Sequence, residues 1–316
     1  MRKLLRRSNR RAKKTVQAEE LETRTLLTGT VRVGLKGDTL TIRGNNQDNV
    51  IQINAGAEDV EDLIQGEDGT RIKFARKLVR AVERGGAEDI SAVDISMRGG
   101  NDVVLIDGNG EGIFGDLNVD LGDGGDTFVA VDGFIEGDVT IENPDASSYI
   151  ALANIEIEGD LSFVGSRSSE VFAMCDVFVD GDVDISMKKG HDTVLITTSE
   201  ISDDLRVSLG RGQDLLGIVD TFVGDDTDVF GYTGDDGALF QDNDWDMPTT
   251  DSIETIYTDA NDVPDDIVDA ATAKVEDLLE DLDDSDLDVP PTLEDAAIKL
   301  NEIFNGEEEE DDMDLA

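Results

Sequence analysis

Aspartates that follow a glycine by two positions are the residues best suited to chemistry in this sequence. A glycine lets the backbone reach positive φ, so that carbonyl oxygens and a following carboxylate can turn toward one point. Oxygen ligands of this kind suit Ca²⁺. The turns read Gly100-Asn-Asp102, Gly124-Gly-Asp126, Gly190-His-Asp192 and Gly212-Gln-Asp214. We therefore expect Ca²⁺ as the candidate cofactor, held near Asp102, Gly124, Asp126, Asp192 and Asp214.

The sequence contains few residues that could form a catalytic site. His191 is the only histidine, so neither a histidine-based triad nor a two-histidine metal site can form. It occupies the variable middle position of a Gly-x-Asp turn, which favours an exposed turn residue. A polysaccharide-active, lyase-like β-helix enzyme is the alternative, and it would need a basic proton acceptor beside acidic ligands. The outward basic residues of the repeats are instead scattered: Lys188, Lys189, Arg206 and Arg211. We predict that the chain is not an enzyme.

A 22-residue repeat must position these turns. In each repeat a first strand alternates apolar and polar residues, as in Leu117-Asn-Val119, which is typical of a half-buried strand. A second strand follows, with inward columns that begin at Phe128 and Ala130. One apolar column runs through Ile113, Ile135, Ile157, Val179, Ile201 and Val223. Repeats that cannot bury a face alone must stack. The sequence therefore predicts an all-β fold, a β-solenoid (β-helix) with 22-residue coils in register between 113 and 222.

A second column of aspartates lies at the start of the first strands, and all but the last, which follows Asp203, come directly after a glycine. It consists of Asp116, Asp138, Asp160, Asp182 and Asp204. Stacked carboxylates about 5 Å apart repel by about 1 kcal/mol per pair even in water, so the column needs an explanation. Either each side chain accepts backbone N–H groups of its own turn, or cation binding is added to that role.

The turn at 121–128 resembles the RTX, or haemolysin-type, nonapeptide Gly-Gly-x-Gly-x-Asp-x-U-x. That resemblance implies Ca²⁺ wrapped between adjacent turns by carbonyl oxygens and the aspartate. The match is partial, because the glycine four residues before the aspartate is present only at Gly122 and Gly210. Two intervening repeats have Ser148 and Glu170 at the aspartate position, and the period is 22 residues rather than 18. The resemblance therefore implies isolated sites rather than a continuous column of Ca²⁺.

The N-terminal segment is basic, with nine of the 26 basic residues in the first 25 positions. Residues 20–28 resemble the LEPR-XLL motif found near the N-terminus of many large exported planctomycete proteins. Matching positions are Leu21, Glu22, Arg24, Leu26 and Leu27, whereas Thr23 stands where that motif has proline. The resemblance implies export to the cell surface or the medium. The alternative is a basic arm on a cytoplasmic acidic scaffold.

Composition divides the chain into four parts. We expect a basic targeting arm at 1–28, an N-terminal β cap at 29–88 and the solenoid at 89–240. An acidic region at 241–316 completes the chain, with short amphipathic helices at 266–282 and 292–304 and a disordered tail. No stretch is long and apolar enough to span a membrane.

Net charge sets the expected partners. The chain has 74 acidic and 26 basic residues, a net charge of −48. Such a chain repels nucleic acid and anionic membranes and attracts cations. Together with the export and the Ca²⁺ that the two resemblances imply, this predicts a secreted or cell-surface structural and interaction solenoid that binds calcium. Its expected partners are cations and matrix or cell-surface components.

Overall fold

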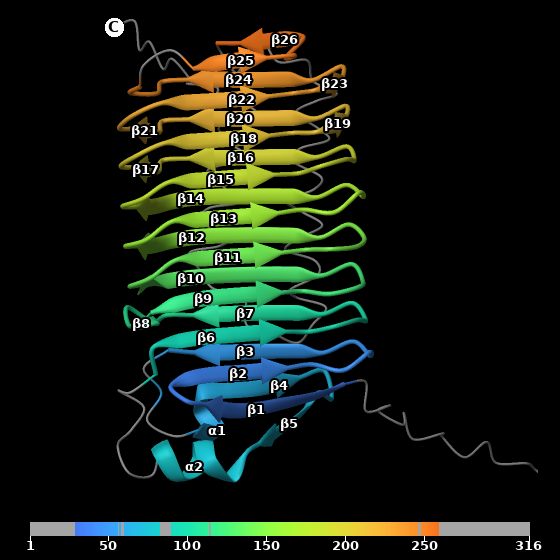
Figure 1. Cartoon of the computed structure of the whole chain (residues 1–316), viewed down its shortest axis with the longest axis vertical. Helices are drawn as coiled ribbons and strands as arrows, with labels where there is room; N and C mark the ends of the chain where they lie inside the picture. Colours follow the sequence, from blue (N-terminus) through green and yellow to red (C-terminus); the bar gives the residue numbers. More distant parts are fainter. Residues whose placement is uncertain are drawn as a thin grey trace, which may run out of the picture.

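The chain winds into a stack of coils, each of which contributes one strand to each of two long sheets (Figure 1). The computed structural model describes residues 29–55, 57, 60–82, 90–113, 115–245 and 248–258. Sheet 1 consists, in spatial order, of β25 (Thr249–Asp251), β22 (Thr227–Phe230), β18 (Leu205–Ser208), β15 (Val183–Ser186), β13 (Leu161–Val164), β11 (Val139–Glu142), β9 (Asp116–Asp120), β6 (Ala92–Ser96), β2 (Thr39–Arg43), β1 (Thr30–Lys36) and β5 (Arg71–Phe74).

Sheet 2 lies opposite and carries the longer strands. Its order is β26 (Thr255–Tyr257), β24 (Gly237–Gln241), β20 (Leu215–Val219), β16 (Thr193–Thr197), β14 (Val171–Val179), β12 (Tyr149–Ile157), β10 (Thr127–Ile135), β7 (Val103–Asp107), β3 (Val50–Asn54) and β4 (Ile64–Glu67). Three short strands extend its margin: β8 (Gly112–Ile113), β17 (Glu200–Ile201) and β21 (Phe222–Val223). A separate small sheet pairs β19 (Arg211–Gly212) with β23 (Thr233–Gly234).

The register confirms the predicted solenoid. Strands of successive coils pair in parallel at an offset of 22 residues, so that Ile135 faces Ile157 and Phe128 faces Ile150. Toward the N-terminus the offset is 24 residues, as for Val103 and Thr127. The inward side chains form one continuous apolar core between the two sheets. Each coil therefore packs its apolar residues between its own two strands and against the coils above and below it, which is how a solenoid is stabilised.

The two sheets bury their residues differently. In sheet 1 the alternation seen in the sequence holds, because Leu117 and Val119 are buried while Asn118 is exposed. Sheet 2 is buried on both faces along β10, β12 and β14, where Val129 and the free Cys175 belong to a second apolar cluster. This second cluster explains why the sequence of these strands is almost continuously apolar.

An N-terminal cap covers the first coil. The strands β1, β2 and β3 confirm three stretches that alternate in the sequence. The cap contains β1, β4 and β5 with the short helices α1 (Val60–Leu63) and α2 (Arg76–Val82). β2 and β3 already pair in parallel with β6 and β7. The sheets therefore continue into 39–54 without a break at residue 88.

The solenoid also extends past its expected end. We placed the boundary at residue 240, but β25 and β26 add a further strand to each sheet. These strands are short and mostly exposed, because the last coil needs apolar residues only toward the coil beneath it. The expected helices at 266–282 and 292–304, the acidic tail and the basic arm at 1–28 lie outside the described residues. None of the described helices is long and apolar enough to cross a membrane.

Candidate functional site

The Gly-x-Asp turns all lie at one corner, where a strand of sheet 1 passes into a strand of sheet 2. The aspartates point inward rather than into solvent. Asp102, Asp126, Asp192 and Asp214 are exposed by only 0%, 1%, 1% and 3%. The sequence grouped these residues by their Gly-x-Asp pattern and did not predict their burial. We call the column formed by Asp102, Asp126, Ser148, Glu170, Asp192, Asp214 and Asp236 the carboxylate corner.

A ladder of hydrogen bonds joins the carboxylate corner from coil to coil. The backbone N–H of Asp102 donates to Oδ1 of Asp126 at 2.8 Å. The same bond, also 2.8 Å, runs from Asp192 N–H to Asp214 Oδ1. Between them the N–H of Asp126 donates to the Ser148 hydroxyl at 3.0 Å. In each of these bonds a side chain accepts a backbone N–H of the preceding coil, which ties the two coils together.

Two acidic members of the corner were not among the predicted site residues. Asp236 accepts the N–H of Asp214 at 3.1 Å, and the signal was present, because Gly234 precedes Asp236 by two positions. Glu170 replaces an aspartate and lies in a coil without the glycine. Its longer side chain reaches back to the Ser166 backbone N–H at 3.2 Å and also accepts the Ser166 hydroxyl proton. Glu170 thus bonds within its own coil and not to Ser148, while its own N–H donates to Oδ1 of Asp192 at 2.8 Å.

The second carboxylate oxygens of the corner are the unusual chemical feature. Those of Asp102, Asp126 and Asp214 are buried and have no hydrogen-bond partner among the residues that the structure describes. Burial in a low-dielectric site disfavours the charged form of a carboxyl group. It raises the pKa of Asp102 to about 8 and the pKa of Asp126 to about 7. The pKa of Asp214 is raised to about 7 for the same reason. These groups need a proton or a cation to complete their environment.

Glycines let the backbones of neighbouring coils approach closely at this corner. A Cβ atom built on Gly124 would lie 1.7 Å from the carbonyl oxygen of Gly100 and 3.3 Å from Oδ1 of Asp126. A Cβ on Gly212 would lie 1.5 Å from the Gly190 carbonyl oxygen and 2.7 Å from Oδ1 of Asp214. Carbonyl and carboxylate oxygens therefore converge at these glycines, and both are ligands that Ca²⁺ accepts.

Few acidic side chains are available as Ca²⁺ ligands at any one point of the carboxylate corner. The residues that the structure describes contain no group of three or more histidine, cysteine, aspartate or glutamate side chains around a common point. A Ca²⁺ ion at Asp102 and Asp126, or at Asp192 and Asp214, would thus rely on one or two carboxylates and on backbone carbonyls. Such a composition is typical of weak extracellular sites rather than of tight buffers.

The exposed aspartate column forms a second ladder in the opposite direction. The N–H of Asp160 donates to Oδ1 of Asp138 at 3.0 Å, and the N–H of Asp182 donates to Oδ1 of Asp160 at 2.9 Å. The partner is therefore the next coil and not the aspartate's own turn, which corrects the sequence interpretation. Each carboxylate gains a hydrogen bond that offsets the repulsion between its neighbours.

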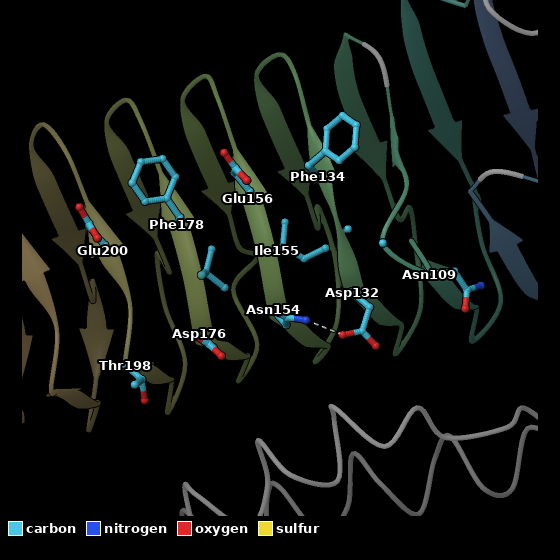
Figure 2. A pocket seen from close by; sticks show the side chains of 13 residues that line it. Asn109, Asp132, Phe134, Asn154, Ile155, Glu156, Asp176, Phe178, Thr198 and Glu200 are labelled. Carbon is cyan, nitrogen blue, oxygen red and sulfur yellow. Dashed lines mark hydrogen bonds between the residues drawn. The ribbon is translucent and has the colours of Figure 1, made fainter.

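A groove of about 700 Å³ runs along the side of the solenoid opposite the carboxylate corner. Figure 2 shows one wall, where Phe134, Glu156, Phe178 and Glu200 alternate from coil to coil. The other wall is a column of left-handed residues that includes Asp132, with φ of 56°, and Asp176, with φ of 58°. Asn154 donates from Nδ2 to Asp132 Oδ1 at 2.7 Å. Asparagine and aspartate tolerate this conformation better than most residues, which explains their choice.

The groove is acidic as well as regular. Its lining includes Asp132, Glu156, Asp176 and Glu200, and no basic residue from the described part of the chain. The sequence pattern did not single it out, because the alternation of phenylalanine and glutamate has a period of two coils.

Comparison of the chain with protein-family models, with curated proteins and with solved structures gives no match.

Proposed function

We propose that this chain is a structural and interaction β-solenoid, secreted or held at a cell surface, that binds Ca²⁺ at the carboxylate corner. The observation that carries the calcium proposal is the set of buried, unpartnered carboxylate oxygens at Asp102, Asp126 and Asp214. A cation there would stabilise the ionised carboxylates, whose pKa values are otherwise raised by burial. The acidic groove and the net charge of −48 would concentrate cations around the solenoid.

Thermal unfolding at constant ionic strength tests the calcium proposal. Generic screening of a charged chain responds to any salt, whereas a specific site responds to millimolar Ca²⁺. We expect the melting temperature to rise in Ca²⁺ relative to Na⁺ at matched ionic strength. The rise should shrink when Asp102 and Asp126 are both changed to Asn. Identical melting curves in the two salts would overturn the calcium proposal.

Export is supported by the segment at 20–28 and is tested separately. Deleting residues 1–28 should leave the melting temperature nearly unchanged, because the apolar core lies beyond them. The same deletion should retain the protein inside the cell, as measured by fractionation of the source cells. Normal export of the deletion variant would show that these residues carry no targeting information.

A further inference from the structure

Basic side chains gather at one hollow of this strongly acidic molecule. Its volume is about 310 Å³, and it lies on the outside of the carboxylate corner, at the edge where β19 and β23 pair (Figure 1). Four cationic side chains line it: Arg167, Lys188, Lys189 and Arg211. The sequence interpretation treated the last three as scattered, and the coil repeat brings them together.

These cations are stacked rather than dispersed. Lys189 and Arg211 are bridged in parallel on adjacent coils, and Arg167 occupies the equivalent position one coil earlier. Coils lie about 4.8 Å apart, and like charges directly opposite each other on adjacent strands are unfavourable. None of the three forms an ion pair with a residue that the structure describes. Neither salt bridges nor packing within the described chain accounts for their position.

Two residues that line the same hollow have a left-handed backbone. Lys188 and Tyr232 have φ of 70° and 68°, in the left-handed region that bulky residues rarely adopt. At the equivalent position of the coil between them stands Gly210, with φ of 95°. Glycine thus fits this turn without strain, yet two coils retain a lysine and a tyrosine. Strained residues retained in this way point to a functional role for their side chains.

Tyr232 gives the hollow an aromatic wall. Its side chain is 58% exposed, and its ring centroid lies 6.2 Å from that of Phe230. An exposed aromatic ring offers an apolar face with a polar edge, to which the face of a sugar ring can stack. Arginine and lysine beside it can pair with carboxylate or sulfate groups, arginine in a bidentate manner. The hydroxyls of Ser186 and Ser208 line the same hollow and can bond to sugar hydroxyls.

We propose that this hollow binds an anionic polysaccharide, a chain of sugars that bear carboxylate or sulfate groups. Charges repeated along such a chain would face Arg167, Lys189 and Arg211, while Tyr232 stacks on a sugar ring. A long nucleic acid is disfavoured, because the remaining surface of a chain with net charge −48 repels it. This inference rests on the proposed interaction role at the cell surface and names the class of partner.

Direct binding to the full chain tests the site. The probes are an oligouronate hexasaccharide, a neutral hexasaccharide of the same backbone, and linear polyphosphate, each measured by calorimetry at low ionic strength. We expect the oligouronate to bind and the neutral sugar not to bind. Changing Arg167, Lys189 and Arg211 together to Gln should weaken oligouronate binding at least tenfold, which is about 1.4 kcal/mol. Tyr232→Asn, which suits the left-handed backbone, should weaken it as well, whereas Tyr232→Phe should not.

The matched control removes three exposed cations from α2 at the other end of the solenoid. Changing Arg76, Lys77 and Arg80 to Gln alters the net charge equally and should leave the affinity within about twofold, a few tenths of a kcal/mol. Equal losses in both triple variants would overturn the proposal, since they would indicate charge attraction without a site. Polyphosphate binding as tight as oligouronate binding, with no effect of Tyr232→Asn, would overturn it too. The assay requires neither export nor Ca²⁺, so its failure is distinguishable from failure of the proposed function.

Discussion

Asp126→Asn should stabilise the protein in alkaline solution. The native carboxyl group of Asp126 keeps its proton up to about pH 7, whereas the unfolded chain releases it near 3.8. Between these values the native state binds more protons than the unfolded state, so its stability falls as pH rises. The amide that replaces this carboxyl group would still accept the N–H of Asp102 through its oxygen, and it cannot ionise.

The size of the effect follows from the pKa difference. About three units at 1.36 kcal/mol each set an upper limit near 4 kcal/mol above pH 7. Solvent near the turn and added salt reduce this, so we expect about 1–2 kcal/mol at about pH 9 and almost none at about pH 5. Asp102 should act in the same direction, because burial raises its pKa to about 8.

Urea unfolding of wild type and variant between about pH 5 and pH 9 measures the difference. Asp138→Asn is the matched control, because it removes the same charge from an exposed rung that also accepts a backbone N–H. Its curve should stay parallel to that of wild type across this range. Parallel curves for Asp126→Asn as well would refute the reasoning. Added Ca²⁺ should restore the alkaline stability of wild type but not of the variant, because a bound cation favours the ionised carboxylate.

Two further substitutions test the packing. Ile185→Asp places an unpaired charge at a position with 0% exposure, so it should unfold the stacked region. Circular dichroism would then show no cooperative unfolding transition. Asp184→Ser, on the exposed face of the same strand, should leave the transition in place. Gly212→Ala should cost about 2 kcal/mol or more in urea unfolding, since its Cβ would lie 1.5 Å from the Gly190 carbonyl oxygen. Gly237→Ala, whose Cβ would meet nothing closer than 3.8 Å, should be nearly neutral, and equal losses would disprove the close approach of the coils.

The fold was largely predictable because two periods coincide in the sequence. Alternation of period two identified the strands, and the 22-residue spacing of Ile113, Ile135 and Ile157 gave their register. The final coil was missed, since β25 and β26 contain few apolar residues. The N-terminal cap was only partly predicted, because short elements such as α1 and β4 carry too few residues for a periodic signal.

The sequence indicated which residues form the candidate site, but it did not indicate that their side chains are buried. Gly-x-Asp spacing located the carboxylates, while their burial depends on the corner between two sheets, which no local pattern encodes. Their hydrogen-bond partners lie 22 or 24 residues away, as for Asp126 and Asp102, and the sequence interpretation named no hydrogen-bond partner for these carboxylates. The hollow at Arg167 and Lys189 was missed for a related reason, because stacked residues are distant along the chain.

The parallel register of the coils has a mechanical consequence. Each coil is hydrogen-bonded only to the coils next to it, so tension applied along the stack opens the bonds of one interface before those of the next. The terminal coil, with its short strands, would peel first and release about 75 Å of extended chain, at ~3.4 Å for each residue of a repeat. Anchored at one end, such a molecule would lengthen in regular steps under load instead of unravelling at once, and each released coil would leave the remaining stack intact.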